Sequence, residues 1–191
     1  MKARLSEIVE IKSGYLFKSR IVNDPYGQVR VIQLKDIDDN GAIYMNKLLT
    51  VSDKEVKGAD FLRKGDIIFK SKSARHTAAV FNDDSNNAII TVHFFLLRLK
   101  TDQILPAYLA WYINQKPAQR YFKTKAGGTR IPIVTKKILE ELEVSIPSLP
   151  TQEKIVAVNN LFIKEKKLLT ELKEKREILV NTSLLNVINR S

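Results

Sequence analysis

The sequence contains no cysteine and only two histidines among its 191 residues, and each scarcity excludes a class of chemistry. Without thiols there is no disulfide scaffold, cysteine nucleophile or thiolate zinc site, and the composition is typical of a reducing compartment. His76 and His93 have no carboxylates at metal-ligand spacing, so we expect no metal site. His93 lies within the apolar run of residues 89–99, which favours a strand residue with a satisfied ring over a ligand.

Glycine is also scarce, with seven residues, and no phosphate-binding glycine motif occurs. Residues 66–72 superficially resemble a nuclease strand, but Ile68 stands where a second carboxylate would be required. The Asn-Pro-Pro-aromatic and Asp-Pro-Pro-Tyr signatures of amino-methyltransferases are missing as well. We therefore predict a chain that is not an enzyme and binds no cofactor itself. The alternative, a small enzyme with an unrecognised site, would require turnover by the isolated chain.

Long apolar runs are missing too, since none approaches the roughly 18 residues that a membrane-spanning helix requires. Near the N-terminus, Glu7 and Glu10 interrupt what would have to be the apolar core of a signal peptide. These features predict a cytoplasmic protein without membrane association.

Positive charge is abundant by contrast. Lys plus Arg number 32 against 21 Asp plus Glu, which gives a formal net charge of +11. Most of the excess lies in residues 1–150. A strongly basic domain indicates a polyanionic partner, most often nucleic acid, although lysines that merely keep a protein soluble would give the same balance.

Residues 1–150 predict a mixed α+β domain with many short strands and no βαβ repeat. Strands are expected at 28–37, after the Lys64-Gly65-Asp66 turn, at 77–81, from Val92 to Leu99 and at 143–146. Asn40-Gly41 predicts a hairpin turn. Pro106 and Pro117 are each expected at the start of a helix, and Thr135 is expected to cap a third.

Residues 151–191 have a different character and predict one long helix. From Thr151, the expected N-cap, to Asn189 there is neither glycine nor proline. About 38 helical residues would make a rod of roughly 57 Å. Its apolar stripe, interrupted by Glu165, Arg176 and Ser183, requires a partner helix unless the helix folds back along its own domain. The expected pairing residues are Ile155, Val158, Phe162, Leu169, Leu172 and Leu179.

Three basic clusters in predicted loops, at 12–20, 69–78 and 115–139, favour nucleic-acid binding, although each alone could be a solvated face. Lysines would bind phosphates, whereas Arg75 and Arg130 would read base edges. The candidate DNA-binding residues are Lys12, Tyr15, Lys18, Lys70, Lys72, Arg75, Lys125, Gly127, Gly128, Thr129 and Arg130.

The junction between the two parts carries a family resemblance. Residues 142–156 read LEVSIPSLPTQEKIV, and the matching positions are Ile146, Pro147, Leu149, Pro150, Gln152 and Ile155. This junction, with the opening LSEIVEIKSG and the segment LRKGDIIF, resembles specificity subunits of type I restriction-modification enzymes. In that family a target-recognition domain passes through such a joint into a long conserved helix. We expect Pro147 and Pro150 to end the last strand before the helix begins at Thr151.

The resemblance implies a target-recognition domain at 1–150 and a spacing, dimerisation and methyltransferase-docking helix at 151–191. Family members usually have two domains and two helices, so this chain resembles a half-subunit that would pair, antiparallel, with a second copy. Such a dimer would read a bipartite palindromic site on double-stranded DNA. Implied partners are an adenine methyltransferase subunit, which would bind S-adenosylmethionine, and an ATP-dependent restriction subunit. A stand-alone dimeric DNA-binding regulator is the alternative.

Overall fold

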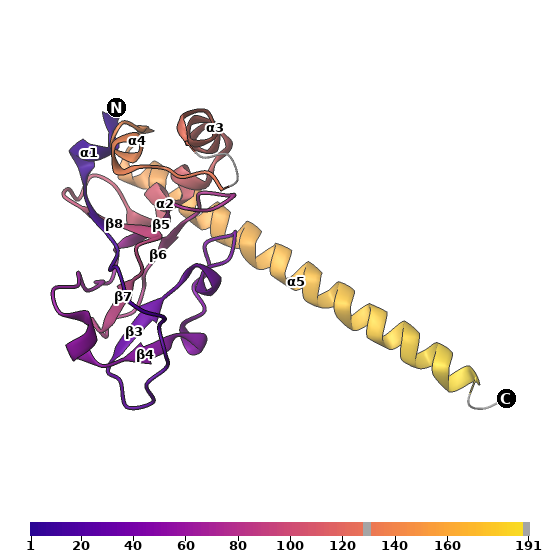
Figure 1. Cartoon of the computed structure of the whole chain (residues 1–191). Coiled ribbons are helices and arrows are strands. Elements are labelled where there is room, and N and C mark those ends of the chain that lie inside the picture. Colours follow the sequence, from indigo (N-terminus) through magenta and orange to yellow (C-terminus); the bar gives the residue numbers. More distant parts are fainter. Residues whose placement is uncertain (128–130, 189–191) are drawn as a thin grey trace. The chain divides into compact units, whose positions relative to one another are not determined.

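The computed structural model describes residues 1–127 and 131–188, and the chain divides into two compact units, Met1–Gln152 and Glu153–Ser191. Unit 1 is a mixed α+β fold, as the sequence predicts, and unit 2 is helical. In Figure 1 four helices gather at one end of unit 1, namely α1 (Leu5–Ile8), α2 (Pro106–Asn114), α3 (Lys116–Lys125) and α4 (Lys136–Glu140). The strands β3 (Val29–Ile32) and β4 (Leu49–Val51) lie at the other end.

A four-stranded antiparallel sheet forms the centre of unit 1. Its order is β2 (Val9–Ser13), β8 (Phe94–Leu99), β5 (Ile67–Lys70), β6 (Ala78–Val80). The central strand β5 pairs with β8 on one side and β6 on the other, and all four of its residues are buried. Short apolar strands that are buried on both faces are typical of a sheet enclosed by other elements.

The second sheet has three strands in the order β4 (Leu49–Val51), β3 (Val29–Ile32), β7 (Ala88–Ile90). The strand β3 is antiparallel to β4 and parallel to β7. One core cluster contains residues of both sheets, among them Ile32, Ile68 and Leu96, so the two sheets share apolar packing. Three 3-10 helices, η1 (Leu34–Asp36), η2 (Met45–Lys47) and η3 (Asp53–Val56), lie in the connections.

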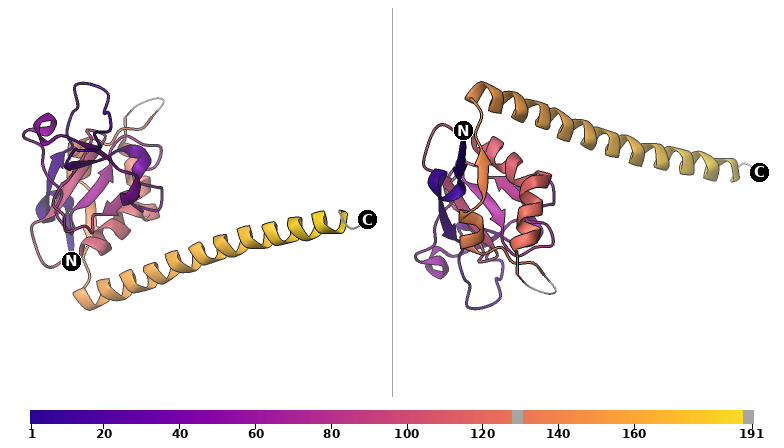
Figure 2. Two further views of the ribbon diagram at one scale, coloured as in Figure 1. Left: turned by 90° about the horizontal axis from the view of Figure 1, so that it is seen from below. Right: turned by 90° about the horizontal axis from the view of Figure 1, so that it is seen from above.

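The remaining elements close the end of unit 1 from which the long helix starts. The strand β1 (Lys2–Arg4) pairs with β9 (Glu143–Ser145), so in both views of Figure 2 the N-terminus lies beside the segment that leads into the long helix. The helix α1 (Leu5–Ile8) follows β1 directly. Thus the first and last strands of unit 1 are neighbours.

The helix starts expected at Pro106, Pro117 and Thr135 are confirmed. Proline stands in the first turn of α2 (Pro106–Asn114) and of α3 (Lys116–Lys125). The Thr135 side chain accepts a hydrogen bond from the Ile138 amide at 3.3 Å and caps α4 (Lys136–Glu140). The Asn40-Gly41 turn is also present, with Gly41 at φ +84 and an antiparallel bridge from Ile37 to Ile43.

One strand begins later than predicted. The strand β8 starts at Phe94, because Val92 and His93 form a turn in which Phe94 N donates to Thr91 O at 3.0 Å. The assignment of His93 to a strand is therefore wrong. The apolar run continues through this turn, so hydrophobicity alone does not reveal it.

The long helix α5 (Leu149–Ile188) also differs from the expectation, since it begins two residues before Thr151. Pro150 lies inside the first turn, where its missing N–H group costs nothing because that group has no partner within the helix. The Ser148 carbonyl accepts hydrogen bonds from the amides of Thr151 at 2.9 Å and Gln152 at 3.0 Å. Thr151 is therefore a residue of the helix and not its N-cap.

Gln152 connects the first turn of α5 to the rest of unit 1. Its side chain is fully buried, and Oε1 accepts from Leu105 N at 2.9 Å, the residue that precedes α2. Its Nε2 donates to Gln103 O and to Pro147 O, both at 2.9 Å. One amide thus satisfies three backbone groups, which would otherwise be buried without partners.

We predict that Gln152→Leu lowers the free energy of unfolding of unit 1 by about 2–4 kcal/mol, because the apolar side chain leaves these three groups unpaired. Urea denaturation monitored by circular dichroism and Trp111 fluorescence measures the change. Glu153→Leu is the matched control at the next, exposed position and should alter stability little. Equal effects of the two substitutions would contradict the role assigned to Gln152.

Candidate nucleic-acid interface

The connection between β5 and β6 is a tight, basic turn at residues 71–77. Both of its ends are held by the antiparallel β5–β6 pair, in which Phe69 lies opposite Ala78. Lys72 and Arg75 are exposed, whereas Ser71 and His76 are buried. The turn therefore exposes two cationic side chains on backbone that is held at both ends by the sheet.

A second basic segment lies beside this turn. Ile133 forms antiparallel bridges with both Lys72 and Gly127, and its amide donates to Gly127 O at 2.9 Å. Val134 N donates to Ser71 O at 2.9 Å. Two of the three predicted basic clusters are thereby brought together, and we call residues 71–77, 125–127 and 131–134 the two-loop surface. The predicted Gly128, Thr129 and Arg130 lie outside the described residues.

Two side-chain amides that the sequence analysis did not select hold the turn in place. Asn114, the last residue of α2, donates to Ala78 O and accepts from Ala78 N, both at 2.8 Å. Gln119 of α3 donates to His76 O at 2.8 Å. Both amides bind backbone at the edge of the sheet. No sequence motif identifies Asn114 and Gln119, because their partners are backbone groups, which every residue type provides.

Lys125 is the last residue of α3 and is exposed beside the exposed Gly127. A lysine at a helix C-terminus is favoured by the helix dipole, and its long side chain can extend beyond the helix. Lys125 therefore adds a third exposed cation to the two-loop surface. Ile131 and Ile133 are 48% and 41% exposed, so this surface also has an apolar component.

The first cluster differs from the expectation in two of its three residues. Lys12, in β2, donates to Asp60 at 2.6 Å and lies 3.7 Å from Glu10, and the hydrogen bond to Asp60 raises the pKa of the Lys12 ammonium. Tyr15 donates its hydroxyl to Glu55 O at 2.9 Å, and its ring packs against the core cluster of β3, β4 and β7. Lys18 is exposed.

This cluster is nevertheless joined to the turn. Val92 N donates to Tyr15 O at 2.9 Å, and Ser71 N donates to the adjacent His93 O at 3.0 Å. Gly14 makes the approach possible, since a Cβ there would lie 2.1 Å from Thr91 O. The cluster at residues 12–20 is therefore attached to the two-loop surface through the 91–93 turn.

Lys70 corrects the predicted set. It ends β5 instead of lying in a loop, it is 5% exposed, and its Nζ donates to Ile37 O. Burial lowers the pKa of its ammonium. The Lys70 ammonium is therefore already bound inside unit 1, and the expectation of an exposed phosphate contact at this position is wrong.

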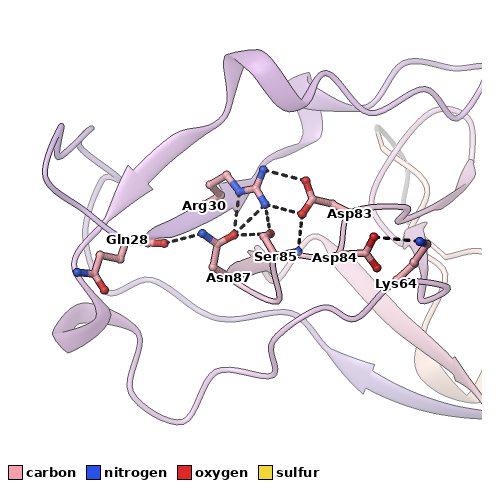
Figure 3. A network of polar contacts seen from close by, with 7 residues as sticks. All are labelled: Gln28, Arg30, Lys64, Asp83, Asp84, Ser85 and Asn87. Carbon is pink, nitrogen blue, oxygen red and sulfur yellow. Dashed lines mark hydrogen bonds and ion pairs between the residues drawn. The ribbon is translucent and has the colours of Figure 1, made fainter.

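Arg30 in β3 shows how other cations of unit 1 are used internally (Figure 3). Its guanidinium forms a bidentate pair with Asp83, at 3.2 and 3.0 Å, and donates through Nε to Asn87 at 3.0 Å. The hydrogen bond from Arg30 holds the pKa of Asp83 well below its usual range. Arg98 likewise donates to the buried Asp66 at 2.6 Å. Both guanidinium groups are bound to neighbouring loops of unit 1, so we assign neither arginine to base recognition.

His76 forms the buried side of the turn. Its ring lies 5.9 Å from the rings of both Phe69 and Phe122, and Nδ1 donates to Lys70 O at 3.0 Å. Its Nε2 is buried without a hydrogen-bond partner in the described structure. Burial lowers the pKa of the imidazole, so the folded turn contains a neutral ring.

We predict that the stability of the turn falls as the pH drops below about 6.5, because the unfolded chain takes up a proton at His76 before the folded chain does. The contribution of neutral His76 to the free energy of unfolding is fully present above that pH. It is lost progressively as the pH falls from about 6.5 to the lower pKa of His76 in the folded state. Urea denaturation at pH 7.5 and pH 5.5 should show a larger loss for the wild type than for His76→Asn. His93→Asn, at the half-exposed histidine, serves as the control and should keep the wild-type response. Parallel losses in all three proteins would contradict the assignment.

Other kinds of site receive no support from the part of the chain that the structure describes. Within residues 1–127 and 131–188, no cluster of three or more histidine or acidic side chains is arranged to hold a metal ion. None of the described helices combines the length and the apolar character needed to cross a membrane.

The chain is similar to known proteins in sequence and in fold. The family model for the type I restriction modification DNA specificity domain matches residues 1–178. The specificity subunit of the type I restriction enzyme MjaIX of Methanocaldococcus jannaschii is 26% identical over 178 residues, 90% of this chain and 40% of the relative. The specificity subunit of the HindI enzyme of Haemophilus influenzae is 25% identical over 137 residues, 70% of this chain and 29% of the relative.

Solved structures show the same fold. The HsdS subunit from Thermoanaerobacter tengcongensis superposes with a TM-score of 0.68 at 19% identity, over 92% of this chain and 45% of that one. The S subunit of a type I restriction-modification system from M. genitalium gives a TM-score of 0.59 at 16% identity, over 90% of this chain and 41% of that one. The chain thus spans less than half the length of these relatives.

Proposed function

This chain belongs to the family of type I restriction-modification DNA specificity domains, and from that membership we propose that it recognises a DNA sequence for such a system. The observation that carries the proposal is the two-loop surface, where bridges at Ile133 hold two basic segments side by side. The surface combines exposed Lys72, Arg75 and Lys125 with backbone that a glycine leaves accessible at residue 127.

The chemistry of this surface fits double-stranded DNA. Lysine side chains neutralise phosphates and give affinity without sequence preference. An arginine on a short, braced turn can donate two parallel hydrogen bonds to the O6 and N7 atoms of guanine in the major groove. We assign phosphate binding to Lys18, Lys72 and Lys125, and base reading to Arg75, with Arg130 as the second reader expected from the sequence.

In the proposed complex this chain would bind DNA and would carry out no reaction itself. An adenine methyltransferase subunit would bind S-adenosylmethionine and modify the site, and an ATP-dependent restriction subunit could join the complex. Residues 1–150 would recognise DNA in the cytoplasm, and residues 151–191 would pair with the helix of a second copy. The exposed apolar side chains of α5, among them Val158, Phe162 and Leu179, support pairing, because such a stripe is unfavourable in water.

We predict that Arg75→Ala weakens binding to the preferred DNA sequence by about 1–3 kcal/mol and relaxes the preference at one base pair. Lys125→Ala should weaken binding to all sequences equally and reduce the slope of log affinity against log salt by about one. Fluorescence anisotropy with specific and scrambled duplexes at several salt concentrations separates the two effects.

The control for these variants is Lys64→Ala. Lys64 precedes β5, at the opposite end of the strand from the turn, and already pairs with Asp84 at 2.9 Å. Its removal should leave DNA affinity nearly unchanged. An equal loss on every sequence for Arg75→Ala would contradict base reading by this residue.

We further predict that the chain, reconstituted with the adenine methyltransferase subunit proposed as its partner, methylates a split palindromic sequence, since two identical recognition units related by a two-fold axis read identical half-sites. Genome-wide mapping of methylated adenines measures the motif. An asymmetric motif would contradict pairing of two copies. Sequence-specific binding without any methyltransferase association would favour the stand-alone regulator.

A further inference from the structure

The helix α5 carries a regular seam with two charges in it. In alternating steps of four and three residues, apolar side chains stand at Val158, Phe162, Leu169, Leu172 and Leu179. All five are more than half exposed in the single chain. Glu165 and Arg176 occupy the same seam, each where the repeat calls for an apolar residue.

The positions of the two charges are symmetric. Glu165 stands four residues before Leu169, and Arg176 stands four residues after Leu172. If two copies of α5 run antiparallel about a centre between Leu169 and Leu172, Leu169 of each copy faces Leu172 of the other. Glu165 then faces Arg176 twice, once on each side of the centre.

The same register extends outward over two further layers. Phe162 of one copy faces Leu179 of the other, and Val158 faces Ser183. Each layer from Val158 to Ser183 therefore joins an apolar pair, an opposite-charge pair, or valine with a small hydroxyl group, and one step further out Ile155 faces Asn186. In an antiparallel two-stranded coiled coil an a position of one helix faces a d position of the other. Each of these four layers joins an a position to a d position.

From this symmetry we propose that Glu165 and Arg176 form two reciprocal ion pairs between copies of this chain and thereby select the antiparallel direction and the register of the α5 pair. This inference rests on the proposed pairing of two copies and goes beyond it by assigning the residues that decide the geometry. Buried polar pairs that specify register are known from coiled coils.

The competing arrangements place the same charges unfavourably. In a parallel pair Glu165 faces Glu165 and Arg176 faces Arg176, so both charged layers are repulsive. In an antiparallel pair shifted by one heptad, Arg176 faces Leu172 or Val158, and each charge loses its solvation without gaining a partner.

One feature of the proposed register opposes it. Lys166 of one copy approaches Lys173 of the other at the edge of the seam. These lysines are exposed, and their long side chains can turn into solvent, so the repulsion is screened. Because charges inside the seam are less screened, the Glu165–Arg176 layers decide the direction.

Charge reversal in the full chain tests the ion pairs. By sedimentation equilibrium, Glu165→Arg and Arg176→Glu should each raise the dimer dissociation constant by roughly 100-fold or more, since two-fold symmetry changes both layers at once. The double variant E165R/R176E restores opposite charges in both layers and should return the constant to within about tenfold of the wild type. In a parallel dimer the single reversals would replace one repulsion with another, and no rescue would follow.

Cysteine cross-linking tests the register directly, because the chain has no cysteine of its own. Oxidation of the double variant V158C/S183C should give a covalent dimer, since these positions face each other at both ends of the seam. Val158→Cys alone and Ser183→Cys alone should not cross-link, because like residues would lie about 38 Å apart along the axis. Within one helix the two positions are equally distant, so an intrachain bridge cannot form.

The outcomes distinguish the two proposals. A wild-type chain that remains monomeric at all concentrations overturns the pairing of two copies and this inference with it, while DNA recognition by the two-loop surface is measured independently. A dimer that lacks both the charge rescue and the cross-link between positions 158 and 183 overturns only the register. Cross-linking of either single-cysteine variant indicates a parallel pair and also overturns it.

Discussion

The complete burial of β5 is the constraint on which most of unit 1 depends. Ile67, Ile68 and Phe69 expose nothing to solvent, and the strand is hydrogen-bonded along both edges. Polar groups next to such a strand have to find partners inside the protein. Before the strand, the buried Asp66 is paired with Arg98. At its end, Lys70 donates to a backbone carbonyl.

The same burial explains why the turn after β5 is a suitable support for side chains that recognise DNA. His76 packs against Phe69 and Phe122, and the backbone of the turn is bound by Gln119 and by Val134. Exposed Lys72 and Arg75 therefore extend from backbone with little freedom to move. A side chain on rigid backbone loses less conformational entropy on binding than one on a mobile loop, and it discriminates better between nucleobases.

Local signals in the sequence predicted much of this fold, and the errors occurred where tertiary contacts decide. Prolines at 106 and 117, Thr135 and the Asn40-Gly41 turn act through their own backbone, so their elements were predictable. The Val92-His93 turn was not, because its backbone is hydrogen-bonded to Tyr15 and Ser71, which are distant in the sequence. The early start of α5 was not either, because Gln152 in its first turn is bound to Gln103 and Leu105. Among the site residues, charge alone could not separate the exposed Lys72 from the buried Lys70 or the ion-paired Lys12. Alternation along β5 was no guide, since that strand is buried on both faces.

A long helix with a seam that contains charges illustrates a more general point about pattern and function. A purely apolar seam would bind more tightly but would tolerate several directions and registers, because leucine packs against leucine in each of them. One acidic and one basic residue at symmetric distances from the centre remove that ambiguity for a self-pairing helix, since a single arrangement satisfies both. In the proposed pair, Glu165 and Arg176, which interrupt the heptad of the single chain, would become partners across the seam. For a protein that would read two separated half-sites, a defined register is of more use than additional affinity, because it keeps the separation between the two recognition units constant.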